Sequence, residues 1–153
     1  MASSAPNKIC LAGTPQHDEK LAANVAITPG MLVELASAST VRPHNAAGGN
    51  ARPMWADVQP FTDPVDGTKS IDVNYGTADT VYLLETKAGD VIYALLAAGE
   101  NVAAGAFLQS DGAGALEAFA GGTGTPAATV ATANEAIDNS GGGTAVRIKV
   151  TSL

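Results

Sequence analysis

Cysteine is nearly absent from the chain: Cys10 is the only one in 153 residues. A single thiol excludes an intrachain disulfide and a cysteine-based zinc site, so Cys10 is expected to be a small apolar residue in a strand. Charge is also scarce, at 15% of residues against about 25% in typical soluble domains. A surface with so few charges indicates that a partner covers part of it in the working state. Aromatic residues reach only 5%, which predicts a thinly packed core.

Basic residues are few and scattered. Eight Lys and Arg stand against fifteen Asp and Glu, which gives a net charge of −7. Nucleic acid is therefore not expected as a partner, because binding to phosphates needs clustered basic side chains. A membrane is not expected either, since no apolar run approaches the roughly 20 residues that cross a bilayer. The first residues lack the charged and apolar regions of a signal peptide, which predicts synthesis in the cytoplasm.

The chain divides into an N-terminal arm, residues 1–28, and one β-rich domain, residues 29–153. The arm has few large apolar residues and is broken by Gly13-Thr14-Pro15. It includes a short strand at Ile9–Ala12 and a strand or helical turn at Leu21–Ile27. An arm of this kind is expected to dock on the domain or to reach a neighbouring molecule.

Short apolar runs separated by Gly, Pro and Asn predict a mainly β fold, a compact antiparallel β-barrel or β-sandwich with an extended N-terminal arm. The run Val91–Ala98 is apolar on both alternating faces, which favours a strand covered on both sides over a helix. Pro53 and Pro60 bracket a short strand at Met54–Val58 and place it at a sheet edge. Further expectations are strands at Met31–Ala36, Asp79–Lys87 and Val146–Thr151, a hairpin through Gly112–Gly114, and one helical turn or a bend at Thr132–Asp138.

Motifs that could carry chemistry are weak. Asp63 and Asp66, in Asp-Pro-Val-Asp-Gly-Thr, resemble the magnesium-binding signature of inositol monophosphatase-like enzymes, but no apolar strand precedes them, and a turn between strands explains them better. His17 and His44 are isolated and are expected to be solvated or hydrogen-bonded loop residues. No nucleophile elbow or phosphate loop is present, and Gly121–Pro126 is expected to be a surface loop. The sequence predicts no enzyme, no cofactor and no metal.

The order of several short segments, made mostly of small apolar residues, resembles the order found in a known family. Asn7–Gly13 leads to Ile27–Leu35, then to Val41–Asn50 and Pro53–Ala56; the later segments are Ile71–Tyr75, Gly89–Val102, Gly105–Gly112 and Ala131–Val150. This order is similar to that of the head decoration, or capsid cement, proteins of tailed bacteriophages. The resemblance implies a β-rich structural protein on the outer surface of the virion, made in the host cytoplasm. Its partners would be the major capsid protein and its own copies, as a homotrimer or alternatively a homodimer.

Five residues are candidates for contact with the capsid: Ile9, Leu11, Leu21, His44 and Trp55. The first three lie in the arm and the other two in or near the irregular segment from His44 to Trp55; for Trp55, a place in the core is the more frequent outcome. Deletion of residues 1–20 is expected to weaken shell binding while the domain stays folded. Two other functions remain open. One is a soluble β-barrel module that binds carbohydrate or a receptor, and the other is a metal-dependent phosphatase built on Asp63 and Asp66.

Overall fold

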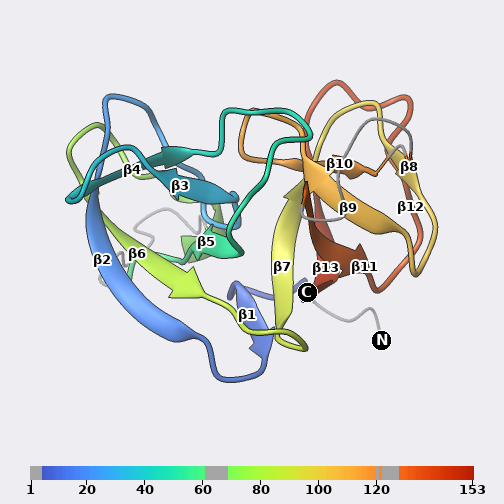
Figure 1. Ribbon diagram of the computed structural model, residues 1–153, viewed down its shortest axis with the longest axis horizontal. Helices are drawn as coiled ribbons and strands as arrows, with labels where there is room; N and C mark the ends of the chain where they lie inside the picture. Colours follow the sequence, from blue (N-terminus) through green and yellow to red (C-terminus); the bar gives the residue numbers. More distant parts are fainter. Residues whose placement is uncertain (1–4, 61–68, 120, 122–127) are drawn as a thin grey trace.

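The structure, a computed structural model, describes residues 5–60, 69–119, 121 and 128–153. Regular structure in these residues consists of thirteen short strands and one 3-10 turn, η1 (Ser70–Asp72). The predicted mainly β fold is confirmed, and Figure 1 shows it as two groups of strands side by side. Asp63 and Asp66 lie outside the described residues, as does most of the Gly121–Pro126 loop.

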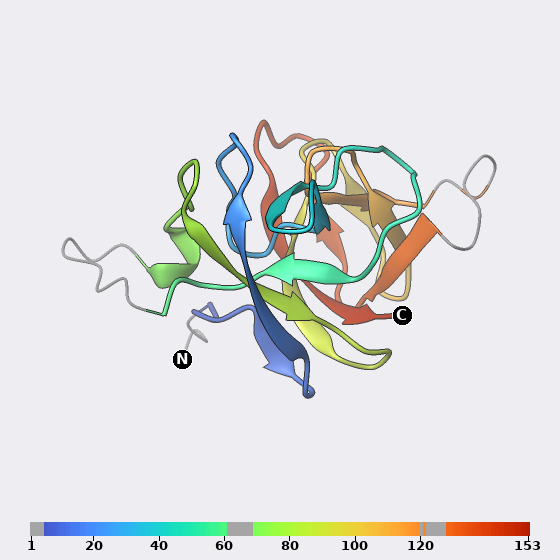
Figure 2. The same ribbon diagram turned by 60° about the vertical axis from the view of Figure 1, so that its left-hand side comes forward.

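The first group, which we call the N-terminal sheet, has five strands in the order β3-β4-β2-β6-β5. Its two ends meet, because Leu32 bridges to Trp55 and the N–H of Gly30 donates to the carbonyl of Ala56 at 2.7 Å. Figure 2 shows the blue β2 ribbon crossing beside the green β6, its antiparallel partner. The strands are Gln16–Ala22 (β2), Val33–Leu35 (β3), Thr40–Pro43 (β4), Met54–Ala56 (β5) and Thr80–Glu85 (β6).

The second group, which we call the C-terminal barrel, is a closed ring of five strands in the order β7-β10-β9-β11-β13. Pairing of β13 with β7 from Val146↔Leu96 to Thr151↔Val91 closes the ring. The ring strands are Val91–Leu96 (β7), Phe107–Ser110 (β9), Leu116–Ala118 (β10), Thr129–Ala133 (β11) and Val146–Ser152 (β13). Cys10–Ala12 (β1) pairs with the start of β7, and Asn101–Val102 (β8) pairs with Ile137–Asp138 (β12).

Several local predictions are confirmed. Val91–Leu96 is a strand whose side chains are all buried or half-buried, as expected for a run that is apolar on both faces. The Gly112–Gly114 turn joins β9 to β10 as an antiparallel hairpin. The proline-bracketed segment forms the strand β5, but not at a sheet edge, because it pairs with β6 on one side and contacts Gly30–Leu32 on the other. Of the two alternatives for the arm, its described part docks: β1 pairs with β7, and β2 pairs with β4 and β6.

Other segments differ from expectation. A further strand, β4, lies between β3 and β2. The polar residues Gln16–Lys20, outside the strands predicted for the arm, form most of β2, because backbone pairing with β6 holds the strand although its side chains are largely exposed. Of the two alternatives for Thr132–Asp138, the structure shows the bend, at Asn134–Glu135, between the end of β11 and the strand β12. Two strand contacts, β2 with β4 and β10 with β7, are parallel.

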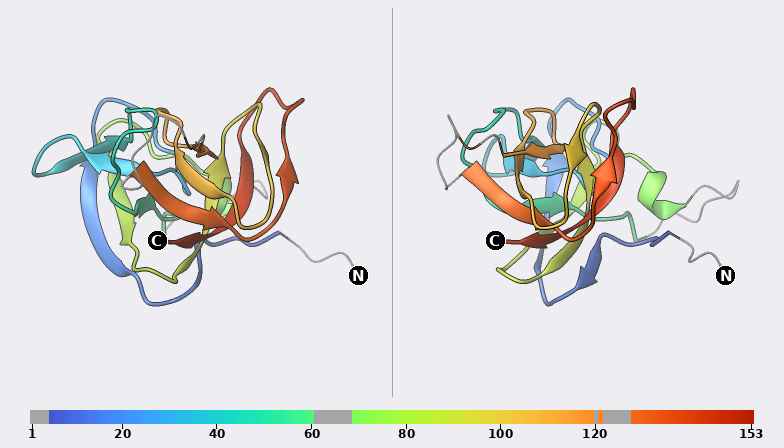
Figure 3. Two further views of the ribbon diagram at one scale, coloured as in Figure 1. Left: turned by 45° about the vertical axis from the view of Figure 1, so that its right-hand side comes forward. Right: turned by 90° about the vertical axis from the view of Figure 1, so that its right-hand side faces the viewer.

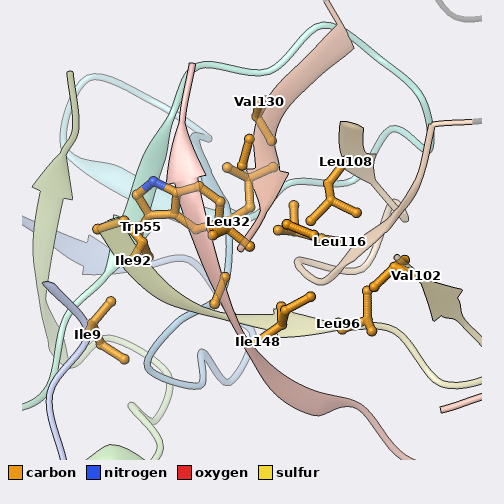
Figure 4. Packing of buried hydrophobic residues seen from close by; sticks show 14 of the residues in the cluster. Ile9, Leu32, Trp55, Ile92, Leu96, Val102, Leu108, Leu116, Val130 and Ile148 are labelled. Carbon is orange, nitrogen blue, oxygen red and sulfur yellow. The ribbon is translucent and has the colours of Figure 1, made fainter. Parts of the chain in front are cut away.

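Two clusters of buried apolar side chains stabilise the molecule. One cluster lies within the N-terminal sheet and includes Tyr75, Val81 and Leu83. The larger cluster fills the C-terminal barrel and continues into the N-terminal sheet through Trp55 and Leu84. Figure 4 shows this larger cluster, with Trp55 at one end and Val102 at the other. The two groups of strands therefore share one core.

Buried hydroxyl groups support Trp55 where the two groups meet. The indole N–H of Trp55, which is fully buried, donates to Thr86 Oγ1 at 3.1 Å. Thr86 Oγ1 donates in turn to the carbonyl of Pro53 at 3.1 Å, and Ser152 Oγ on β13 lies 2.8 Å away. Since a threonine hydroxyl has one hydrogen, Ser152 is the donor in that last bond. The three side chains thus form a satisfied polar network between β5 and β13.

Arg147 on β13 makes a second connection between the groups. Its Nη1 donates to the carbonyl of Pro29 at 2.8 Å and its Nη2 to the carbonyl of Ile71 at 2.6 Å. Burial lowers the pKa of the guanidinium, and Asp72, 3.7 Å from Nη2, partly offsets this effect. Gly30 leaves the necessary space: at its φ of +91° a Cβ would lie 2.6 Å from Nη1. A side chain at residue 30 would displace the arginine.

We predict that Thr86→Val lowers the free energy of unfolding by about 1–3 kcal/mol, because it leaves the buried indole N–H without an acceptor. Thr86→Ser keeps the hydroxyl and is the matched control, with a smaller loss expected. Urea unfolding monitored by Trp55 fluorescence measures both variants. A loss in Thr86→Ser as large as that in Thr86→Val would contradict this prediction, because serine keeps the hydroxyl and valine keeps the methyl group.

Candidate interaction surfaces

The structure separates the five candidate contact residues into two groups. Ile9 and Trp55 are fully buried and His44 is nearly so, which assigns all three to the interior. Their side chains offer no surface to another molecule, and the frequent outcome for Trp55, a place in the core, is the observed one. Leu11 is half-buried and Leu21 is exposed. The candidates with accessible surface are therefore Leu11 and Leu21.

His44 connects the two groups of strands. Its Nε2 lies 3.1 Å from the carbonyl of Asn50, which can only accept, so Nε2 carries a proton. Its Nδ1 lies 2.8 Å from Ser110 Oγ at the end of β9. In the neutral ring Nδ1 accepts the serine proton, and Ser110 Oγ accepts from the N–H of Gly112 at 3.1 Å. His44 is thus a hydrogen-bonded loop residue, one of the two expected forms, and its role is structural.

Among the residues that the structure describes, no three His, Cys, Asp or Glu side chains gather as a metal site. His17 lies exposed on β2, remote in the fold from the buried His44. No helix in the described part of the chain is long and apolar enough to cross a membrane.

One hollow of about 330 Å³ lies beside β2. Its lining includes His17, Asp18, Glu19, Asp57 and Tyr82. Burial raises the pKa of Asp57 above its ordinary value, while the bond from the Val58 N–H and the nearby His17 act in the opposite direction. The hollow is acidic and open to solvent.

Exposed apolar side chains define a first surface on the N-terminal sheet. Leu21, Val25 and Leu35 are 44%, 42% and 49% exposed. Leu21 pairs with Thr40 of β4, and Leu35 pairs with Val41 of the same strand. Because Thr40 and Val41 are consecutive, Leu21 and Leu35 point to opposite sides of the sheet. Leu21 shares its side with Thr40, Arg42 and Glu34, and we call these four residues the β4 surface.

Charged pairs accompany the β4 surface. Arg42 Nε donates to Glu34 Oε1 at 2.8 Å across the β3–β4 ladder. Lys20 lies 3.0 Å from Asp18 on β2 and holds the pKa of that carboxyl below its ordinary value. An exposed leucine next to polar groups that already have partners is a combination typical of protein–protein interfaces.

A second surface lies on the outside of the C-terminal barrel. Phe107 on β9 is 53% exposed, the largest fraction among the large apolar side chains of the described residues. Phe119 lies opposite it, since its N–H donates to the Phe107 carbonyl at 2.8 Å and follows the register of the hairpin. On the other side Thr132 pairs with Phe107, and Thr151 pairs with Thr132. We call these four residues the β9–β11 face.

Comparison with known proteins gives no relative from which a function could be transferred: no family model matches the chain, and neither does any curated protein.

Sequence reasoning missed both Leu35 and Phe107. Each lies within a predicted strand, where alternation alone leaves open which face meets the core. For Phe107 a signal exists, because Phe107 and Gln109 alternate with Leu108 and Ser110, and only one of these pairs can point inward. The arginine connection was missed for a different reason: the partners of Arg147 are 118 and 76 residues away in the chain.

The raised pKa of Asp57 predicts a pH-dependent effect of Asp57→Asn. When the pKa of a carboxyl is higher in the folded state than in the unfolded state, ionisation of the carboxyl destabilises the fold. This loss of stability is absent below the unfolded pKa of about 3.9 and complete above the folded pKa. Asp57→Asn should therefore unfold at a higher temperature than the parent chain near neutral pH, and the difference should vanish in acid. Thermal melts across this pH range measure the effect.

Asp138→Asn is the control, because the opposite change in stability is expected near neutral pH. Bonds from the Ser140 hydroxyl and backbone N–H lower the pKa of Asp138, so its ionised form stabilises the fold above its unfolded pKa. This variant should lose stability near neutral pH and match the parent chain in acid. A neutral-pH loss in both variants would contradict the assignment for Asp57.

Proposed function

We propose that the chain is a structural virion protein that binds the outer surface of a phage capsid and cements neighbouring capsomers. Its partner is the major capsid protein, and its role is to stabilise the DNA-filled head. No catalytic step belongs to this function. The order of sequence motifs described above first indicates it, and the architecture supports it.

The observation that carries the proposal is the presence of two separate surfaces with exposed apolar side chains on one firmly connected molecule. The β4 surface lies on the N-terminal sheet, and the β9–β11 face lies on the C-terminal barrel (Figure 1). The shared core, the Trp55 network and Arg147 hold the two groups of strands together. A protein that cements a shell must touch at least two other molecules at fixed relative positions, and two such surfaces meet that requirement.

The β4 surface is the better candidate for the capsid contact. Leu21, which is 44% exposed, buries further area on binding, and the Glu34–Arg42 pair on the same side of the sheet provides polar groups around it. Each contact of this size is weak, but a shell presents many identical sites. Several linked contacts then raise the overall affinity without any single strong interface.

Self-assembly is part of the proposal. The family resemblance predicts a homotrimer or alternatively a homodimer, and either form would present several β4 surfaces to the shell at once. This multiplies contacts in the way that cementing requires.

One observation favours the alternative function, a carbohydrate- or receptor-binding module displayed on a virion. Modules of that kind use exposed aromatic rings, and Phe107 and Phe119 provide two neighbouring rings on the outside of the barrel. A glycan-binding screen with the Phe107→Ser variant as the control distinguishes this function, because a sugar site on these rings would be lost in the variant.

Co-sedimentation with expanded heads that lack the protein tests the main proposal. Saturable binding at a fixed ratio to the coat protein supports it, and absence of binding by folded protein overturns it. Deletion of residues 1–20 is not a clean version of this test, because it removes β1 and most of β2 from their pairings with β7 and β6. Point substitutions on the surface avoid that problem.

We predict that Leu21→Ser binds heads about tenfold more weakly than the parent chain. A leucine that becomes fully buried contributes about 1–2 kcal/mol, and 1.4 kcal/mol corresponds to a factor of ten. Leu153→Ser is the matched control, since Leu153 is as exposed as Leu21 but lies beside β11. Equal weakening in both would contradict the assignment of the β4 surface to the capsid.

A further inference from the structure

A row of four uncharged side chains crosses the outside of the C-terminal barrel. The register places Phe119, Phe107, Thr132 and Thr151 next to one another on β10, β9, β11 and β13. Directly opposed residues on antiparallel strands point to the same side of a sheet, so these side chains share one face. Figure 3 turns this side of the barrel to the viewer, with β11 and β13 in orange and red.

Charge is absent from the centre of this face. Neither β9 nor β11 contains a charged residue. The nearest acid on the hairpin, Glu117, accepts a hydrogen bond from the amide of Gln109 at 2.8 Å. At the other end of the row, Lys149 lies 3.9 Å from Glu135. Both flanking charges therefore have partners, and the face itself is neutral and apolar.

The rest of the chain is acidic, with a net charge of −7. Two copies of such a chain repel one another over most of their surface, and like charges brought together at an interface are strongly unfavourable. A neutral apolar face is where two copies can approach without this cost. The β4 surface differs, because the Glu34–Arg42 pair lies on it and suits a partner with polar groups.

We propose that the β9–β11 face binds a second copy of this chain, the same face meeting itself around a two-fold axis. In such an isologous contact Phe107 of each copy lies near the centre and the threonine row packs against its symmetry mate. Aromatic anchors at the centre of an interface contribute most to its affinity. This inference deepens the self-assembly in the proposed function by naming its surface, and it can be tested without a capsid.

Sedimentation velocity over a wide range of protein concentrations tests the inference. The parent chain is expected to shift from monomer to dimer as concentration rises. Phe107→Ser is expected to weaken the dimer at least tenfold, and Leu21→Ser, a substitution of the same kind on the β4 surface, is expected to leave it unchanged. A parent chain that stays monomeric at every concentration, or a dimer that survives Phe107→Ser, overturns the inference.

A second variant keeps the inference testable if Phe107→Ser does not fold. Thr132→Glu places a charge on the same face without altering Phe107, and in an isologous contact the two new carboxylates come close together. Dimerisation is expected to fall in this variant, and more strongly at low salt, where screening is weak. A dimer unaffected by Thr132→Glu overturns the inference. Head co-sedimentation of Phe107→Ser then separates the two proposals, because capsid contact through the β4 surface remains possible for a monomer.

Discussion

The contact between Arg147 and the backbone of the N-terminal sheet is the constraint on which the arrangement of the molecule depends. One guanidinium reaches two carbonyl groups, of Pro29 and Ile71, which come from separate segments of that sheet and its connections. The aromatic ring of Tyr93 lies beneath it, 5.8 Å from the guanidinium carbon. A Cβ at residue 30 would meet both this side chain and the carbonyl of Tyr93, which is one reason for the glycine there.

This connection has a cost as well as a benefit. A partly buried cation loses hydration, and neutral carbonyl groups with one distant carboxylate return only part of that free energy. Its value lies more in fixing one relative placement of the two groups of strands than in net stability. The apolar core can tolerate small sliding movements, whereas two directional hydrogen bonds at 2.6 and 2.8 Å cannot. The two candidate surfaces consequently keep a fixed separation, and this is what a bridging protein needs.

Glycine and proline residues, which mark the turns between strands, made much of the fold predictable. The hairpin at Gly112–Gly114 and the strand at Val91–Leu96 follow from local chemistry that tertiary contacts reinforce. The strand β2 could not be found in this way, because a run of Gln, His, Asp, Glu and Lys carries no alternation and depends on pairing with β6. The candidate surfaces were only partly predictable: Leu21 is exposed, but Ile9 and Trp55 are buried in the core. Sequence shows that a residue is apolar but not which apolar residues remain uncovered.

Closure of the C-terminal barrel bears on how the chain folds as it is synthesised. The strand that completes the ring, β13, pairs with β7 and β11 and is the last of the thirteen to leave the ribosome. Until then β7 has an unpaired edge, and Thr86, which accepts the hydrogen bond of Trp55, lacks the bond from the hydroxyl of Ser152. Pairing between strands distant in sequence is slow, and open edges in partly made chains promote aggregation. The chain therefore completes its fold only after translation has passed residue 152, and a pause before that point would leave an unfinished barrel exposed to its neighbours.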